Sequence, residues 1–430
     1  MKLTRRQMAG GMGAASVAAL GSMPAGAQQQ VTLDVLYCLP SFARFHEPIA
    51  AEFMKKFPGI KIQFRAPAAN YDEGHQAMLR AAVTNQLPDV YYSGYHLLSE
   101  LMRTLVKRGQ ANDLGPMMAA EPAAWRSANY SDALLGLGKV DGKLWGLAFN
   151  ASTPIVYINE TLLKKAGGSV ASFPTDWNGI LDLAIRIRKA QPDVAGISYD
   201  VHNWPDDWLF RSLILSQGGK LLNDAETEVA FGGPVGLRMM QMSRRFVSEA
   251  GMDLLDWEQS KQAFCAGKTG IYFHTPAVLK QVTDLIGGKF NLETAKFPID
   301  DKANGGIPTG GNAAIILARD EAKKKAAWEF LKFVTGPDAQ KIVVEMTGYM
   351  PTNVKAVEKE YLGPFYDANP NFRTVFSQVD RARPWQGYPG TNATRIWRQQ
   401  RDVMNAVMRG ELAAEAAIDR VVKETNTLIK

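Results

Sequence analysis

Aromatic and acidic side chains come together in one short stretch of the chain, Trp204-Pro205-Asp206-Asp207-Trp208. A polyhydroxylated solute such as a sugar is bound by flat aromatic rings against its apolar faces and by planar polar groups that reach its hydroxyls. The two indoles and two carboxylates therefore suit a binding platform with hydrogen-bonding acids at its edge. The same residues also fit a capped helix start with Asp206 as the N-cap, and this alternative stays open.

Further candidates for ligand contact lie at strand ends and in loops, which is where open α/β sheets bind ligands. The aromatic candidates of this kind are Tyr71, Tyr92, Tyr95, Trp385 and Tyr388. For each of them, packing in the core is the competing interpretation. Gly310-Gly311-Asn312 allows backbone N–H groups to approach a ligand closely, although hinge torsions explain the two glycines equally well.

The residue spacing gives little support to enzymatic or metal chemistry. A glycosidase needs two carboxylates that flank one bond, whereas Asp206 and Asp207 are sequence neighbours and no second acid cluster pairs with them. The nucleophile pattern Gly-x-Ser-x-Gly is missing from the sequence. Gly267-Lys268-Thr269-Gly270 lacks the first glycine of a phosphate-binding loop and precedes a predicted strand. The five His and two Cys form no short ligand pair, so we expect no metal and no cofactor.

Strands and helices alternate along the first part of the chain. Apolar and β-branched runs predict strands over residues 31–39, 60–64 and 88–92, and helical spacing predicts helices over 47–57, 71–83 and 95–107. This rhythm predicts a parallel sheet covered by helices. The length of 430 residues favours two domains. Residues 141–168 combine a turn, two apolar strands broken at Pro154 and a helix capped by Asn159, so we expect a crossing between domains there.

Several motifs follow one another in a recognisable order. They are Asn150–Gly168 (NASTPIVYINETLLKKAGG), Phe173-Pro174-Thr175-Asp176-Trp177, Gly310-Gly311, Ala327–Phe333 (AWEFLKF) and Thr347-Gly348-Tyr349-Met350-Pro351. In this order they resemble the family 1 extracellular solute-binding proteins, the receptors of sugar-type ABC importers. The resemblance implies an α/β fold of two lobes, each a mainly parallel sheet with helices on both faces. Three hinge crossings would then divide the chain into an N-terminal lobe (31–152 plus 312–348) and a C-terminal lobe (153–311 plus 349–430).

Within that family the chain resembles most the glycerol-3-phosphate-binding branch. The resemblance implies ligand contacts for Tyr71, Ser152, Trp208 and Tyr349, beside the candidate platform residues Trp204 and Asp206. The branch carries an acid and an arginine at the positions that are Tyr95 and Pro389 here, which favours a sugar or sugar-like solute. A glycerol-3-phosphate or glycerophosphodiester receptor is the alternative and requires a basic residue in the cleft, for which Arg44, Arg383 and Arg395 are the candidates.

The first residues predict export. Thr4-Arg5-Arg6-Gln7-Met8 precedes a weakly apolar run, and Ala25-Gly26-Ala27 fits a cleavage site, so residues 1–27 are interpreted as a twin-arginine signal peptide. We therefore expect a periplasmic protein that binds a small sugar-like molecule and delivers it to the transmembrane subunits of an ABC permease. A secreted carbohydrate-active enzyme is the alternative from another class.

Charge and cysteine content complete the expectation. The segment at residues 1–27 holds three cations and no acid, so its removal lowers the formal net charge from +6 to +3. This net charge is too small, and the charged residues are too dispersed, to indicate a nucleic-acid partner. We expect the protein to be a monomer. Cys38 and Cys265 fall in different predicted lobes, and a disulfide between them would lock the hinge. We therefore predict two buried thiols.

Overall fold

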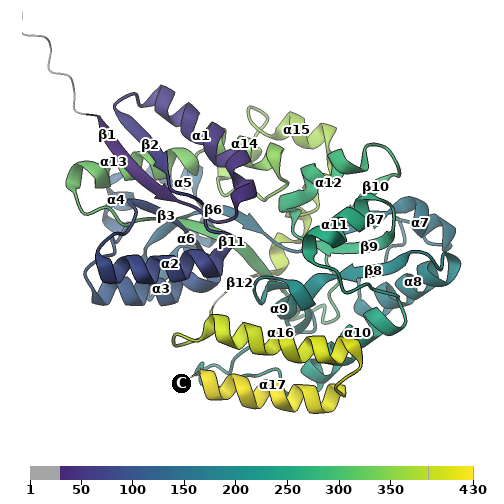
Figure 1. Cartoon of the computed structure of the whole chain (residues 1–430). Helices are drawn as coiled ribbons and strands as arrows, with labels where there is room; N and C mark the ends of the chain where they lie inside the picture. Colours follow the sequence, from purple (N-terminus) through teal and green to yellow (C-terminus); the bar gives the residue numbers. More distant parts are fainter. Residues whose placement is uncertain (1–29, 386, 430) are drawn as a thin grey trace, which may run out of the picture.

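The computed structural model describes residues 30–385 and 387–429 of the chain. The predicted export segment at residues 1–27 lies outside the described residues. Two bodies of sheet and helix lie side by side, and two long helices, α16 (Ala393–Arg409) and α17 (Ala414–Leu428), run along one edge (Figure 1). The predicted α/β fold class is confirmed by this arrangement.

The first sheet has six strands in the order β12-β11-β3-β1-β2, with β6 paired to β11 off this path. The strands are β1 (Val31–Leu36), β2 (Ile60–Phe64), β3 (Val90–Gly94), β6 (Gly146–Ser152), β11 (Ile307–Ile316) and β12 (Ala382–Pro384). Strand β1 pairs in parallel with β2 and β3, as the alternating pattern predicts. Strand β11 runs antiparallel to β3 and β6 and parallel to β12.

Helices cover both faces of this sheet because successive strand residues point to opposite sides. Tyr92 belongs to the core under α1 (Ala43–Lys56), α13 (Glu321–Val334) and α14 (Pro337–Met346). Its neighbour Tyr91 belongs to the core under α2 (Tyr71–Thr84) and α3 (Tyr95–Lys107). Helix α1 begins four residues before the predicted start at residue 47, because a 3-10 turn at Pro40–Phe42 runs directly into it.

The second sheet has four strands in the order β10-β7-β9-β8. They are β7 (Ile155–Asn159), β8 (Ala195–Tyr199), β9 (Thr269–His274) and β10 (Leu292–Ala295). One face packs on α8 (Trp177–Ala190) and α10 (Pro234–Ser248), and the other on α11 (Trp257–Cys265) and α12 (Leu279–Ile286). Cys38 and Cys265 are both buried and unbridged, as predicted.

Shorter elements complete the chain. The remaining helices are α4 (Gly115–Ala120), α5 (Ala123–Asn129), α6 (Asp132–Gly136), α7 (Glu160–Lys165), α9 (Trp208–Leu215) and α15 (Gly363–Ala368), and β4 (Lys139–Val140) and β5 (Lys143–Leu144) form a small hairpin. Asn159 caps α7 as predicted, because its Oδ1 accepts the N–H of Leu162 at 3.2 Å. Among the described helices, none has both the length and the apolar character that a membrane crossing requires.

The chain passes from one sheet to the other more than once. Strand β6 of the first sheet continues through Thr153 and Pro154 into β7 of the second sheet. Strand β11 follows β10 and brings the chain back, and Met350 then pairs with Ala151 beside the first crossing. The three crossings therefore lie close together.

Candidate functional site

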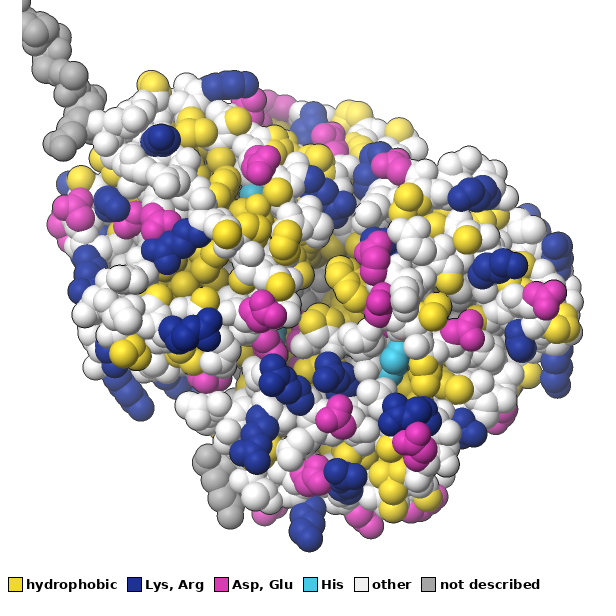
Figure 2. All heavy atoms as spheres, viewed as in Figure 1, with side chains coloured by type: hydrophobic (Ala, Val, Ile, Leu, Met, Phe, Trp, Pro, Cys, Tyr) yellow, Lys and Arg dark blue, Asp and Glu magenta, His cyan; other side chains and the backbone are white. Residues whose placement is uncertain are grey.

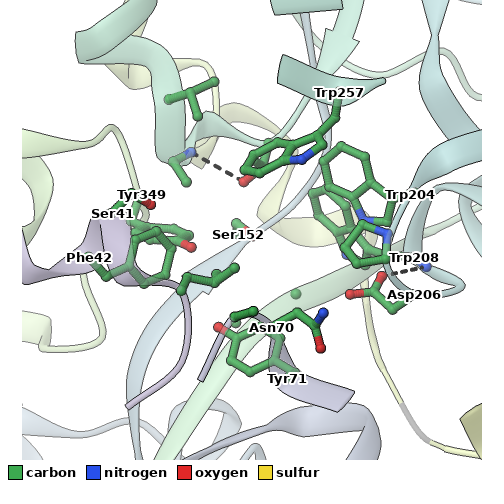
Figure 3. Close-up of a pocket in the computed structure, with 18 of the residues that line it drawn as sticks. Ser41, Phe42, Asn70, Tyr71, Ser152, Trp204, Asp206, Trp208, Trp257 and Tyr349 are labelled. Atoms are coloured by element: carbon green, nitrogen blue, oxygen red, sulfur yellow. Dashed lines mark hydrogen bonds between the residues drawn. The ribbon is translucent and has the colours of Figure 1, made fainter. Parts of the chain in front are cut away.

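A cavity of about 350 Å3 opens between the two sheets, beside the three crossings. A hollow is visible there in the space-filling view (Figure 2). Crossing residues Ser152, Gly310, Gly311 and Tyr349 line it. The remaining walls come from segments that are far apart in sequence, which Figure 3 shows as sticks.

One wall is built from three tryptophans, Trp204, Trp208 and Trp257 (Figure 3). The Trp204 and Trp208 rings are stacked at a centroid distance of 5.9 Å, and Trp257 lies edge-on to Trp204 at 6.3 Å. Trp208 opens α9, and its Nε1 donates to the carbonyl of Pro308 at 3.1 Å. Trp257 opens α11, whose start is fixed by a capping box on Asp256. The wall is therefore rigid and apolar.

The opposite wall carries Phe42, Tyr349 and Tyr71. Phe42 and Tyr349 meet edge to face at 6.0 Å. Tyr71 opens α2, which Asn70 caps through the N–H of Glu73 at 2.8 Å. Asn312 does not line the cavity but donates from Nδ2 to the Tyr71 hydroxyl at 3.0 Å. Asn312 therefore positions Tyr71.

Asp206 is the buried acid of the site. Its Oδ1 accepts the N–H of Trp208 at 3.1 Å, so it also helps to cap α9. Burial raises the pKa of Asp206 well above its usual range, and the neighbouring Asp207 raises it further. Asp207 itself pairs with Arg211 at 2.5 Å and accepts the Nε1–H of Trp385 at 2.8 Å. Burial therefore favours the protonated form of Asp206, and a protonated carboxyl both donates and accepts hydrogen bonds.

Two cationic side chains line the cavity. Lys261 is buried and donates to Glu258 at 2.7 Å and to Gln281 at 3.1 Å, so its charge is already compensated. Arg44 of α1 donates from Nη2 to the carbonyl of Ala277 at 3.0 Å. Ala277 lies in the 3-10 turn Pro276–Val278 that follows β9 of the second sheet, so this bond joins the two sides of the cleft.

Glycine is required at Gly310 and at Gly311 for two different structural reasons. A Cβ at Gly310 would lie 2.8 Å from Nε1 of Trp208, so only glycine lets the indole lie on the strand. Gly311 has φ +121° and no room for a side chain beside the carbonyl of Asn150. Gly310 thus admits an aromatic ring, and Gly311 serves the backbone bend.

The cavity gathers nine of the thirteen residues predicted from the sequence, namely Tyr71, Ser152, Trp204, Asp206, Trp208, Gly310, Gly311, Tyr349 and Trp385. Trp385 stacks on His96 at 3.9 Å, and His96 lines the cavity too. Of the three candidate arginines, only Arg44 lines it. Arg383 is held by the carbonyls of Asp380 and Ala382, and Arg395 is exposed on α16.

The other predicted residues lie outside the cavity wall. Tyr92 is in the core and packs on His46 and Phe149 at 4.6 and 4.7 Å. Tyr95 is buried, and its hydroxyl donates to the carbonyl of Asn150 at 2.8 Å. Tyr388 is buried against Gln400, which donates to its hydroxyl at 2.9 Å. Asn312 lies behind Tyr71. These placements favour the core interpretation for Tyr92, Tyr95 and Tyr388.

Sequence reasoning missed several lining residues, above all Phe42 and Trp257. Phe42 belongs to a turn just after the first strand, and the end of a strand in an open α/β sheet was the available signal. Trp257 carried no such signal, because only the packing of α11 beside Trp204 brings it to the cleft. Within the described residues, no group of three or more His, Cys, Asp or Glu is placed to hold a metal ion.

Comparisons with known proteins agree with this geometry. The sequence model described as bacterial extracellular solute-binding protein matches residues 39–341. The sn-glycerol-3-phosphate-binding periplasmic protein UgpB of Agrobacterium fabrum is 23% identical over 339 residues, which cover 76% of this chain and 77% of that one. UgpB of Pectobacterium atrosepticum is 22% identical over 71% of this chain and 69% of its own.

Solved structures share the two-lobed fold. UgpB from Mycobacterium tuberculosis in complex with glycerophosphocholine superimposes with a TM-score of 0.79 at 18% identity, covering 93% of this chain and 98% of that one. The GacH receptor of Streptomyces glaucescens, solved unliganded and with acarbose, gives 0.77 at 20% identity and the same coverages. Maltose-bound MalE3 of T. maritima gives 0.77 at 17% identity, covering 93% and 100%.

Proposed function

Because the chain belongs to the bacterial extracellular solute-binding proteins, we propose that it is the substrate-binding component of an ABC importer for a sugar or sugar-like solute. The observation that carries the proposal is the cavity with three tryptophans on one wall and Phe42, Tyr71 and Tyr349 on the other. Aromatic rings on two walls, with a few polar groups at their edges, suit a polyhydroxylated ring.

In this proposal, the polar groups of the cavity bind the hydroxyl groups of the solute. Asp206 accepts a hydrogen bond from one hydroxyl of the solute and, in the protonated form that its burial favours, donates to another; Ser152 adds a second donor and acceptor. Gly310 also lines the cavity, with the Trp208 indole packed against it.

We place the boundaries of the two lobes at the three crossings. We assign residues 31–152 plus 312–348 to the N-terminal lobe and residues 153–311 plus 349–430 to the C-terminal lobe. Solute that contacts both walls binds the closed state more tightly, and only this difference in affinity shifts the population toward closure. The closed, monomeric protein then delivers its solute to the permease in the periplasm, after export directed by the twin-arginine signal at residues 1–27.

Thermal unfolding against a solute panel tests the proposal. The mature protein is first stripped of co-purified solute by unfolding and refolding, then heated with single sugars, disaccharides, polyols and glycerol phosphates. A solute at about a hundred times its dissociation constant is expected to add about 2.7 kcal/mol to the free energy of unfolding. Mass spectrometry of the recovered solute is expected to show no chemical change. A stripped protein that no member of the panel stabilises contradicts the proposal, and a converted solute favours the secreted enzyme.

One observation favours a second candidate, a receptor for glycerol 3-phosphate or a glycerophosphodiester. Arg44 lines the cavity, and its Nε–H is buried without a hydrogen-bond acceptor among the described residues. The guanidinium group of an arginine is a planar fork of N–H donors, and it binds a phosphate group through two hydrogen bonds. The curated relatives bind sn-glycerol 3-phosphate according to their names.

Arg44→Gln separates the two candidates. If the solute is a neutral sugar, we expect its affinity to stay within about threefold of the wild type, because a neutral partner has no charge that pairs with the guanidinium. If the solute is a phosphoester, we expect a loss of about tenfold or more, because one charge-assisted contact disappears. Isothermal titration calorimetry measures both, and Arg383→Gln, which removes a cation outside the cavity, is the matched control.

A further inference from the structure

A second, larger cavity of about 740 Å3 adjoins the aromatic cleft and shares Asn70, Asp72 and Pro205 with it. It runs between α2 and α16, one from each side of the molecule (Figure 1). Each helix contributes residues at intervals of three and four, which lie on one helix face. The α2 face is Glu73, Gln76, Ala77 and Arg80, and the α16 face is Thr394, Trp397, Arg398 and Arg401. We call this cavity the arginine groove.

Arginines outnumber acidic residues on the lining of the groove. Four arginines line it against the two acids at the start of α2, Asp72 and Glu73. Arg65 is held by Asp34 through contacts of 2.5 to 2.9 Å and is therefore compensated. Arg401 lies 3.9 Å from Asp402 on its own helix. Burial raises the pKa of Asp72, whereas a hydrogen bond with Thr394 and the charge of Arg398 lower it, so Arg398 faces an acid of α2. Among the described residues, no hydrogen bond engages the guanidinium of Arg80 or that of Arg398. Figure 2 shows basic side chains gathered over α16 next to the hollow.

Helix faces that pack against each other are normally apolar. The facing sides of α2 and α16 are mostly polar and leave a cavity between them. The Arg80 and Arg398 side chains are exposed to solvent, and desolvation and like-charge repulsion both oppose bringing them closer together without an anion. An anion between them removes the repulsion and gives each fork a bidentate partner. The groove is therefore suited to hold an oxyanionic group, and its continuity with the aromatic cleft makes one elongated site.

We propose that the arginine groove is a second subsite, which binds a phosphate, sulfate or carboxylate extension of the solute whose sugar-like part lies on the tryptophan wall. The inference rests on the proposed function and deepens it by naming the solute class: a sugar-like molecule with an anionic arm. Arg80 and Arg398 determine the preference for the charged arm, and Arg44, on the other side of the cleft, is not required for it.

The test uses matched pairs of neutral and charged solutes. Isothermal titration calorimetry at low salt compares glucose with glucose 6-phosphate, trehalose with trehalose 6-phosphate, and glycerol with glycerol 3-phosphate. For a pair that binds, we expect the charged member to bind about tenfold more tightly or better in the wild type. In the double variant Arg80→Gln/Arg398→Gln, we expect this preference to fall to about twofold or less, with the neutral member's affinity unchanged.

Arg395→Gln is the matched control, because Arg395 is exposed on the same helix but does not line the groove. It is expected to keep the full preference. Unfolding midpoints of all variants are measured first, so that a loss of affinity is separated from a loss of folded protein.

Three results would overturn the inference. An equal loss of affinity for both members of a pair means that Arg398 instead acts as a latch toward the acids of α2 when the lobes close. A preference that survives the double variant but disappears in Arg44→Gln places the anion in the aromatic cleft. Neutral solutes that bind as well as charged ones leave the proposed function standing without the second subsite, whereas a panel in which nothing binds removes both.

Discussion

Replacing Trp204 by alanine is expected to lower the affinity for the solute of the aromatic cleft about a hundredfold, the range of a central aromatic hot spot. Trp204 lies between Trp208 and Trp257 on the tryptophan wall, and it is only 6% exposed. Removing its ring takes away a flat face for the solute and also leaves the two neighbouring rings without their shared support. Calorimetric titration with the solute identified by thermal unfolding measures the loss.

Two controls distinguish lost recognition from lost structure. A buried tryptophan changed to alanine costs about 3–5 kcal/mol of stability, so the unfolding midpoint of the variant is measured as well. Trp204→Phe keeps an aromatic face and is expected to retain affinity within about tenfold of the wild type. Trp125→Ala removes the same side chain from α5, away from the cavity, and is expected to leave affinity unchanged. Wild-type affinity in folded Trp204→Ala would contradict the tryptophan platform.

The second large effect concerns the buried acid beneath this wall. Asp200 accepts hydrogen bonds from Ser198 at 2.7 Å and from Ser260 at 2.8 Å. It therefore ties the end of β8 to α11, the helix that carries Trp257. Burial raises the pKa of Asp200 to about 7, although the two serine hydroxyls lower it. At neutral pH the acid thus titrates inside the folded protein.

The sign of the resulting pH dependence follows from linkage. The folded state keeps the Asp200 proton that the unfolded chain releases above its usual value near 4, so raising the pH favours unfolding. The stabilising contribution is fully present below pH 4 and is lost as the pH rises through about 7. At about 1.4 kcal/mol per pH unit, the wild type is expected to lose roughly 4 kcal/mol relative to Asp200→Asn between pH 4 and pH 8.

Urea unfolding of both proteins across this pH range measures the difference. Asp141→Asn is the control, because the ion pair with Arg103 lowers the pKa of Asp141 and its titration lies below the range tested. Its difference from the wild type is expected to be flat from pH 4 to pH 8. Stability curves of wild type and Asp200→Asn that run parallel over the same range would show that Asp200 does not hold its proton in the folded state.

Local sequence patterns predict much of the secondary structure. Helix α3 begins and ends at the predicted residues, Tyr95 and Lys107. Helix α7 starts after Asn159 as its cap predicts. These features depend on hydrogen bonds and side-chain periodicity within about ten residues, so a single sequence contains them. The order of the crossing motifs likewise indicated the two-lobed family before any contact was known.

The face that a side chain presents was harder to predict. Tyr71 and Tyr92 both follow the ends of early elements in the sequence, yet only Tyr71 reaches the cavity. Tyr92 lies inside β3, where the strand alternation turns its ring toward the helices α1 and α13. Tyr71 opens a helix beyond a strand end, where no layer covers it. The strand continues two residues past its predicted end at residue 92, which places Tyr92 inside the strand instead of at its end.

Local sequence patterns predicted the types of most helices and strands and indicated an aromatic site, because such patterns depend on neighbours along the chain. The presence of Phe42 and Trp257 in the cleft, and the approach of α2 and α16 with their arginines, follow from the tertiary structure alone. Those residues stand far apart in sequence, and their proximity depends on how the two sheets pack around the crossings. Packing of this kind is a property of the whole fold, so no local pattern contains it.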